Sequence, residues 1–135
     1  MANTKAEPVF TASGTVVRGK GLGNTVGMPT ANLDTSDDVS SVVPGVYAVD
    51  VTLDGRVYYG ITHTGKRPSV DDSEQITIET YIFDFDGELY DKALSLRAYK
   101  FIRPTVNFDS LEEVKKQVDK DIAAVKEFFK TIGGQ

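Results

Sequence analysis

The sequence contains no cysteine and a single histidine among its 135 residues. Without cysteine, the chain can form neither a disulfide framework nor a metal site built from thiolates. With one histidine, it cannot form a zinc site that needs several histidines. The chain therefore has neither disulfides nor a structural zinc site of these kinds to stabilise it. Its stability has to come from a hydrophobic core, and any catalysis has to use other residue types.

Long apolar runs and excess positive charge are also missing. No apolar stretch approaches the roughly 20 residues of a membrane span, and residues 1–8 lack the hydrophobic centre of a signal peptide. We therefore expect a cytoplasmic protein without membrane partners. We also expect a monomer. The formal net charge of −5 disfavours nonspecific binding to nucleic acid. A polyanionic ligand would need backbone amides, a few basic groups and a metal ion.

The length predicts one domain, residues 9–135, after a flexible tail over residues 1–8. Short β-branched and aromatic segments separated by turn residues predict several strands, and Asp54-Gly55 is a strong hairpin signal. Residues 34–41 and 63–73 read as loops, the second because of Gly65 and Pro68. The predicted strands cover residues 9–18, 46–53, 56–62, 75–85 and 92–102.

One helix is predicted at the C-terminal end. Ser110 and Glu113 have the spacing of a capping box, and Gly133-Gly134 would end the helix. Between them, apolar residues recur every three or four positions and form one stripe. We therefore predict a small antiparallel barrel with this helix packed against it. The stripe consists of Leu111, Val114, Val118, Ile122, Val125, Phe129 and Ile132.

A glycine-rich segment, residues 19–27, is followed by Pro29, Thr30 and Asn32. Glycines allow a turn whose amide groups form a nest for phosphate, although such a segment is more often only a turn. If residues 30–32 are extended, Thr30 and Asn32 point to the same face. Hydroxyl and amide oxygens suit Mg²⁺, so the segment has the outline of a metal–nucleotide site.

Glu79 is the strongest candidate for chemistry. It lies within a hydrophobic predicted strand, on a face shared with Tyr81 and Phe83. A carboxylate in such a place is costly unless it is paired or functional, and it could accept a proton from a substrate hydroxyl. The alternative is an exposed glutamate on a solvated strand face. His63 reads as a loop or structural histidine.

A second polar cluster lies where the helix begins. Arg103-Pro104 precedes Asn107-Phe108-Asp109-Ser110, and free amides at a helix start can bind a ligand. The alternative is helix capping, with Phe108 as a hydrophobic staple.

Taken together, these segments resemble the riboflavin kinases of the bacterial and eukaryotic type over residues 10–129. The resemblance rests on motifs that occur in the family's order, with Pro29-Thr30-Ala31-Asn32 the most specific. The others are Gly14-x-Val16, Gly19-x-Gly21-x-Gly23, Pro44-x-Val46-Tyr47, Gly65-x-Arg67-Pro68, Glu79-Thr80, Leu89-Tyr90, Arg103-Pro104 and Phe108-x-Ser110-Leu111.

The resemblance implies a six-stranded antiparallel Greek-key barrel. It also implies transfer of the ATP γ-phosphoryl group to riboflavin, giving FMN and ADP, with Mg²⁺ held by Thr30 and Asn32 and with Glu79 as the catalytic base. Nucleotide-binding positions would be Gly19, Lys20, Gly21, Gly23, Asn24, Pro29, Thr30, Asn32, Leu89 and Tyr90. Flavin-binding positions would be Glu79, Arg103, Asn107, Phe108, Asp109 and Ser110.

The chain departs from the family pattern at a few positions. Asn24 replaces an arginine of many bacterial members, Asp91 replaces a glycine, and His63 and Ser69 replace Asn and Thr. The adenylyltransferase domain that many bacterial members carry is not expected here, so the chain would be a stand-alone kinase or a domain of one. The alternatives are a weak or inactive flavin- and nucleotide-binding regulatory module, or an unrelated small barrel.

Overall fold

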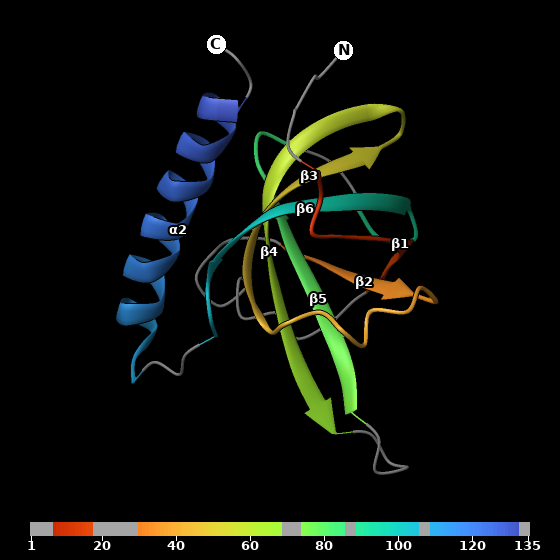
Figure 1. Ribbon diagram of the computed structural model, residues 1–135, viewed down its shortest axis with the longest axis horizontal. Coiled ribbons are helices and arrows are strands. Elements are labelled where there is room, and N and C mark those ends of the chain that lie inside the picture. Colours follow the sequence, from red (N-terminus) through yellow and green to blue (C-terminus); the bar gives the residue numbers. More distant parts are fainter. Residues whose placement is uncertain (1–6, 18–29, 69–73, 86–88, 106–108, 133–135) are drawn as a thin grey trace.

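The fold is known from a computed structural model that describes residues 7–17, 30–68, 74–85, 89–105 and 109–132. Six strands form a closed barrel, and a single helix, α2 (Leu111–Ile132), lies along one side of it (Figure 1). The predicted fold class is therefore confirmed. The expected tail over residues 1–8 lies mostly outside the described residues.

The barrel is antiparallel throughout, with the spatial order β1-β2-β5-β4-β3-β6. Strands β3, β4 and β5 follow one another as hairpin neighbours, and β2 returns to lie beside β5, which is a Greek-key arrangement. β4 and β5 run side by side in Figure 1, paired over nine residues from Gly60 opposite Ile82 to Pro68 opposite Glu74. The strands are β1 (Phe10–Val17), β2 (Ala31–Thr35), β3 (Gly45–Leu53), β4 (Arg56–Pro68), β5 (Glu74–Ile82) and β6 (Ala93–Arg103).

The predicted hairpin between β3 and β4 is confirmed. Asp54 and Gly55 both have positive φ, 52° and 79°, as a two-residue turn of the primed type requires. The turn sets the register of nine residue pairs from Leu53 opposite Arg56 to Gly45 opposite Thr64.

Two predicted strands end at the wrong residue, and the two predicted loops each overlap a strand. β4 does not end at Thr62 but continues to Pro68, because residues 64–68 keep pairing with β5 down to Glu74. β5 ends at Ile82 rather than Phe85, because Asp84 adopts a φ of 59° and turns the chain. The predicted loop over residues 34–41 begins inside β2.

Two hydrophobic clusters stabilise the fold. The first fills the barrel interior with buried side chains such as Val16, Val49 and Leu96, and Tyr58 of β4 packs against it. The second lies between the outer wall of the barrel and α2, where Phe129 stacks on Tyr59 with ring centroids 4.1 Å apart. The two faces of each strand therefore have different partners, one the barrel core and the other the helix or solvent.

The start of α2 follows the predicted capping box in its first bond, whereas the return bond goes to Asp109 instead of Ser110. The Glu113 amide donates to the Ser110 hydroxyl over 3.2 Å, and the Glu113 carboxylate accepts from the amide of Asp109. Within the predicted stripe, Val114, Val125 and Phe129 are buried, whereas Leu111 is 51% exposed and does not join the core.

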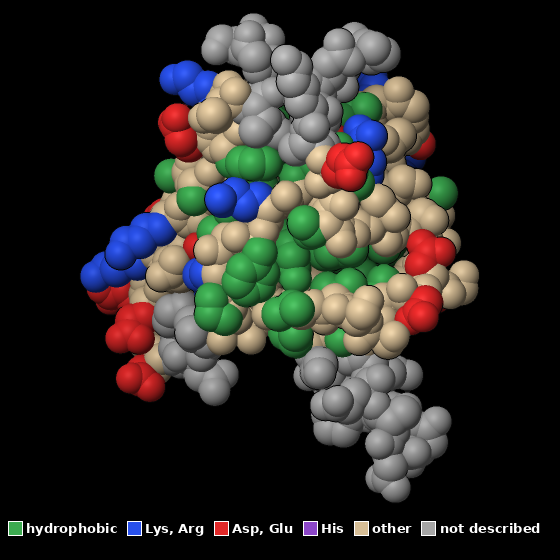
Figure 2. All heavy atoms as spheres, in the orientation of Figure 1, with side chains coloured by type: hydrophobic (Ala, Val, Ile, Leu, Met, Phe, Trp, Pro, Cys, Tyr) green, Lys and Arg blue, Asp and Glu red, His purple; other side chains and the backbone are tan. Residues whose placement is uncertain are grey.

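Figure 2 shows hydrophobic side chains gathered over the strands in the middle of this face, with charged side chains around its margin. In the part of the chain that the structure describes, no helix is long and apolar enough to cross a membrane.

Candidate functional site

The first strand of the site, β2, brings Asn32 beside Glu79. The two residues are directly opposite each other in the β2–β5 ladder, so their side chains lie on the same face of the sheet. Ala31, the neighbour of Asn32, is 1% exposed and points into the barrel. Asn32 and Glu79 therefore project from the outer wall of the barrel, where both are half-buried.

Thr30 completes this group. Its Oγ1 hydroxyl donates to Oε2 of Glu79 over 3.5 Å, across 49 residues of sequence. Thr30 and Asn32 thus lie on the same side of the sheet, as their spacing of two predicted, and the carboxylate of Glu79 lies with them. A hydroxyl, an amide and a carboxylate converge on one patch of the outer wall.

The carboxylate of Glu79 is held in an unusual environment. Burial raises the pKa of Glu79 above the ordinary value for glutamate, and the hydrogen bond from Thr30 opposes this in part. A carboxylate with a raised pKa is a stronger base than a fully solvated one. The alternative of a freely solvated glutamate does not describe this half-buried side chain.

The glycine-rich segment cannot be placed in the site, because Gly19, Lys20, Gly21, Gly23, Asn24 and Pro29 lie outside the described residues. What the structure describes is the two ends of the segment. Val17 at the end of β1 lies opposite Asn32, so the chain leaves β1 and returns to β2 beside the patch that Thr30, Asn32 and Glu79 form. The segment's role stays a prediction.

Leu89 and Tyr90 lie near the end of β1. Both are half-buried and pack against the barrel core. Asp91, which follows them, donates its amide to the carbonyl of Val16 over 2.8 Å and has a φ of 68°. The segment therefore borders the end of the barrel from which the glycine-rich segment starts. The predicted nucleotide contacts of Leu89 and Tyr90 remain predictions.

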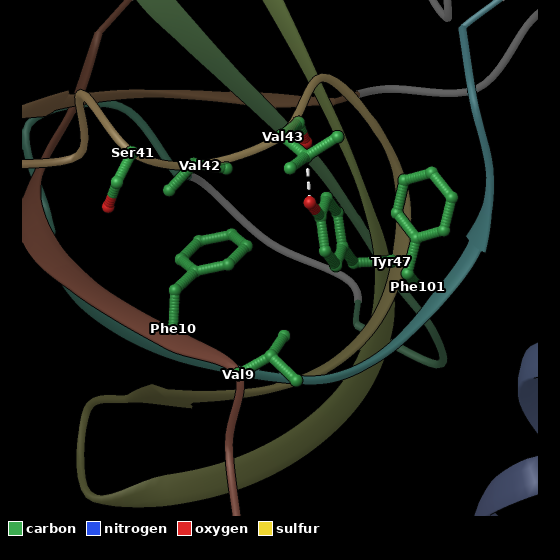
Figure 3. A pocket seen from close by; sticks show the side chains of 7 residues that line it. All are labelled: Val9, Phe10, Ser41, Val42, Val43, Tyr47 and Phe101. Carbon is green, nitrogen blue, oxygen red and sulfur yellow. Dashed lines mark hydrogen bonds between the residues drawn. The ribbon is translucent and has the colours of Figure 1, made fainter.

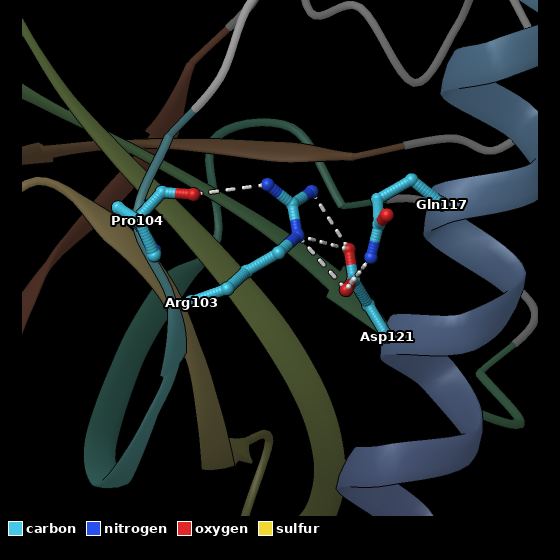
Figure 4. Close-up of polar contacts among 4 residues, drawn as sticks. All are labelled: Arg103, Pro104, Gln117 and Asp121. Carbon is cyan, nitrogen blue, oxygen red and sulfur yellow. Dashed lines mark hydrogen bonds and ion pairs between the residues drawn. The ribbon is translucent and has the colours of Figure 1, made fainter.

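Arg103 is the last residue of β6, and its side chain points toward α2 and is largely buried (Figure 4). Its Nε and Nη2 atoms donate to the carboxylate of Asp121, and Nη1 donates to the carbonyl of Pro104. Asp121 also accepts from Gln117 and is only 4% exposed. These contacts give Arg103 a role in holding the helix to the barrel, which the sequence did not reveal, and its predicted flavin contact remains a prediction.

The other predicted flavin-binding positions lie at the start of α2. Asp109 and Ser110 are exposed and take part in the cap described above. Asn107 and Phe108 lie outside the described residues, so the proposed staple and any flavin contact there are not described.

The prediction that His63 lies in a loop is wrong. It lies within β4, directly opposite Glu79. Thr62 and Thr64 on either side are fully buried and face the barrel interior, so His63 faces outward with Glu79. Residues 62–64 are all polar, so no alternation of apolar and polar residues marks this segment as a strand, and Gly65 and Pro68 favour a loop locally.

A pocket of about 330 Å³ lies at the end of the barrel where β1 begins (Figure 3). Its walls are mostly apolar, and the hydroxyl of Tyr47 donates a hydrogen bond to the carbonyl of Val43. No charged side chain lines it, so it does not suit a triphosphate. The lining residues are Val9, Phe10, Ser41, Val42, Val43, Tyr47 and Phe101.

Within the described ranges, no group of three or more histidine, aspartate or glutamate side chains could hold a metal ion. The oxygens of Thr30, Asn32 and Glu79 have the chemistry that Mg²⁺ prefers, but they are too few to complete its coordination. They fit a metal ion that is also bound by phosphate oxygens and water.

The fold and this patch define a class of protein: a closed six-stranded barrel with a polar site on its outer wall and a C-terminal helix packed against β3, β4 and β6. The model of one family, Flavokinase, described as riboflavin kinase, matches residues 7–129. The chain belongs to the riboflavin kinase family.

Individual relatives agree with this assignment. The chain is 38% identical over 120 residues to the trifunctional protein RibF/MnmA of Mycoplasmoides gallisepticum, covering 89% of this chain and 18% of that protein. It is 37% identical over 121 residues to the RNA-binding riboflavin kinase RibR of Bacillus subtilis, covering 90% and 52%. It is 34% identical over 120 residues to a bifunctional riboflavin kinase/FMN adenylyltransferase of Listeria monocytogenes, covering 89% and 38%. The chain thus spans about half or less of the length of these relatives.

Two solved structures are also similar. A Streptococcus pneumoniae structure described as a macrolide-efflux protein is 32% identical with a TM-score of 0.80, covering 88% of this chain and 38% of that one. A riboflavin kinase from Trypanosoma brucei is 19% identical with a TM-score of 0.63, covering 89% and 79%, and this likeness supports the fold alone.

Proposed function

We propose that the chain transfers the γ-phosphoryl group of ATP to the 5′-hydroxyl of riboflavin, giving FMN and ADP. Family membership supports this reaction, and the observation that carries the site is the convergence of Thr30, Asn32 and Glu79 on one outer patch. Phosphoryl transfer asks a protein mainly for positioning and for neutralisation of charge. A few oxygen ligands and one base are sufficient for that purpose.

In this proposal, Thr30 and Asn32 hold Mg²⁺ together with the phosphates of the nucleotide. A bound Mg²⁺ neutralises phosphate charge and fixes the γ-phosphoryl group for in-line attack. The amides of residues 19–27 complete the phosphate site, and Leu89 and Tyr90 lie toward the nucleotide base. These assignments extend the family resemblance to particular residues of this chain.

Glu79 accepts the proton of the riboflavin 5′-hydroxyl as the oxygen–phosphorus bond forms and ADP leaves. Its half-buried position and raised pKa support this role. The hydrogen bond from Thr30 orients the carboxylate next to the metal ligands. In this proposal the base lies beside the incoming hydroxyl, close to the metal ligands, and leaves the path from that oxygen to the phosphorus clear.

The test is FMN formation from riboflavin, ATP and Mg²⁺, measured by chromatography. We expect product with the wild-type chain, no product without a divalent cation, and a higher KM for ATP when Thr30 is changed to Ala. Binding of riboflavin or FMN with no ATP-dependent product, even at high protein concentration, would instead support the regulatory module. Absence of any thermal protection by nucleotide or flavin would contradict both.

A further inference from the structure

The outward-facing residues of five strands form one continuous row around the barrel. Asn32 lies opposite Glu79, Glu79 opposite His63, His63 opposite Val46, and Val46 opposite Arg103. Directly opposed residues of antiparallel strands project from the same face. The row therefore runs from the proposed metal ligands, through Glu79 and His63, to the ion pair that holds α2.

His63 occupies the side of Glu79 that faces away from the metal ligands. Beyond it, Val46 is only 3% exposed because α2 covers that part of the wall, whereas His63 is exposed. In phosphoryl transfer, the attacking and leaving oxygens lie roughly in line, on opposite sides of the transferred group. With the nucleotide held at Thr30 and Asn32, an alcohol on the His63 side of Glu79 satisfies this geometry, because Asn32 and His63 flank Glu79 on opposite sides.

The next outward-facing position of β4 after His63 is a glycine, Gly65. A Cβ added at Gly65, two positions further along β4, would lie 3.9 Å from Cε1 of His63 and 3.4 Å from Oγ1 of Thr77. Because Gly65 has no side chain, the backbone between His63 and Thr77 is not covered by a side chain of its own. Thr77 lies opposite Gly65 on β5, two residues before Glu79.

The imidazole of His63 is also chemically available. In the described part of the chain, no hydrogen bond uses it. Desolvation lowers the pKa of His63, the charge of Arg103 lowers it further, and the Asp121 carboxylate opposes this. The ring is therefore neutral at neutral pH and offers one donor and one acceptor.

We propose that His63 is a binding residue for the acceptor substrate: its imidazole forms a hydrogen bond with the polyhydroxyl chain of riboflavin and holds the 5′-hydroxyl against Glu79, over the space left by Gly65. This inference rests on the proposed function. It assigns a substrate contact to a position where the chain departs from its family pattern.

The experiment compares His63→Ala, His63→Asn and the wild-type chain. Both the steady-state KM values and the equilibrium Kd for riboflavin, from flavin fluorescence, are measured. We expect His63→Ala to raise the Kd and KM for riboflavin about tenfold, as the loss of one hydrogen bond would. The KM for ATP should stay within about twofold. His63→Asn keeps a donor and an acceptor and should recover most of the affinity.

Two further variants separate a local contact from a general effect. Val57→Ala changes an exposed side chain at the other end of the same strand and should leave the riboflavin Kd unchanged. Gly65→Ala, which has space for its methyl group, should weaken riboflavin binding without lowering the thermal unfolding midpoint.

The outcomes distinguish this inference from the proposed function. A wild-type chain that neither binds riboflavin nor makes FMN would overturn both. A wild-type chain that binds riboflavin, with a Kd that His63→Ala leaves unchanged, would overturn the role of His63 alone. Equal increases in the KM for ATP and riboflavin would also overturn it, since a residue on the acceptor side should not affect the nucleotide.

Discussion

Asp121, in the middle of α2, receives the guanidinium group of Arg103, at the end of β6, in a two-pronged ion pair. The Nη2–Oδ2 distance is 2.8 Å and the Nε–Oδ1 distance is 2.9 Å. Both side chains are largely buried, so the pair fixes where the helix lies on the barrel. The same pair ends the row of residues that contains Glu79 and His63, and it thereby links helix docking to the site.

Removing one partner of this pair should destabilise the protein strongly. Asp121→Ala leaves the Arg103 charge only 19% exposed and without its carboxylate, and breaking a buried pair in this way costs about 3 kcal/mol or more. Urea unfolding would measure the loss. The matched control is Lys116→Ala, which removes an exposed pair with Glu112 and should change stability by less than about 0.5 kcal/mol. Similar small losses for both variants would show that the Arg103 pair does not hold the helix.

Glu79→Gln should separate catalysis from stability. If Glu79 is the base, the turnover number should fall by roughly a hundredfold or more. The free energy of unfolding of the Glu79→Gln variant at neutral pH should be equal to or higher than that of the wild-type chain. The reason is that the substitution removes a charge that burial disfavours. Glu127→Gln, on the exposed surface of α2, is the control and should change neither quantity. An unchanged turnover number would remove Glu79 from its proposed role.

The pH dependence of both quantities follows from the raised pKa of Glu79. The native state holds this proton more tightly than the unfolded state does, so Glu79 lowers stability as pH rises between the ordinary glutamate pKa and the raised one. Turnover has the opposite trend and should fall as pH drops through the raised pKa. A pH series of turnover and urea unfolding, with Glu79→Gln as the reference, would show whether the two trends share one midpoint.

Local signals predicted much of the fold. The Asp54-Gly55 turn and the Ser110 cap depend on residues close together in sequence, and both were located correctly. The alternation of residues 76–82 also predicted that Glu79 shares a face with Tyr81, but not that this face points outward from the barrel. Such features follow from backbone preferences and burial periodicity, which a sequence displays directly.

Features that depend on distant partners could not be predicted in this way. β4 continues past Gly65 and Pro68 because its ladder with β5 outweighs their local preference for a loop. The approach of Thr30 to Glu79 and of Arg103 to Asp121 depends on strand order and helix docking, which no short spacing encodes. Only the family resemblance suggested that the first pair belongs to one site.

Asp91 should respond in opposite directions to two small substitutions. Its φ of 68° lies in the left-handed region, which glycine enters freely, aspartate tolerates and alanine resists. We expect Asp91→Gly to raise the free energy of unfolding by about 0.5 kcal/mol and Asp91→Ala to lower it by about 1 kcal/mol. Chemical unfolding would measure both. If both variants shifted stability in the same direction, the charge of Asp91 rather than its backbone conformation would determine the effect.

Two glycines of β4 offer the last contrast. A Cβ at Gly60 would lie 2.5 Å from the carbonyl oxygen of Tyr81, whereas one at Gly65 would meet nothing closer than 3.4 Å. The Tyr81 carbonyl belongs to the backbone of β5 and cannot move without disturbing the ladder. Gly60→Ala should therefore lower the free energy of unfolding by about 2 kcal/mol, and Gly65→Ala should leave it nearly unchanged. Urea unfolding of the two variants would test this. Equal losses would mean that the wall beside His63 is as crowded as the wall beside Tyr81, and that no substrate fits over Gly65.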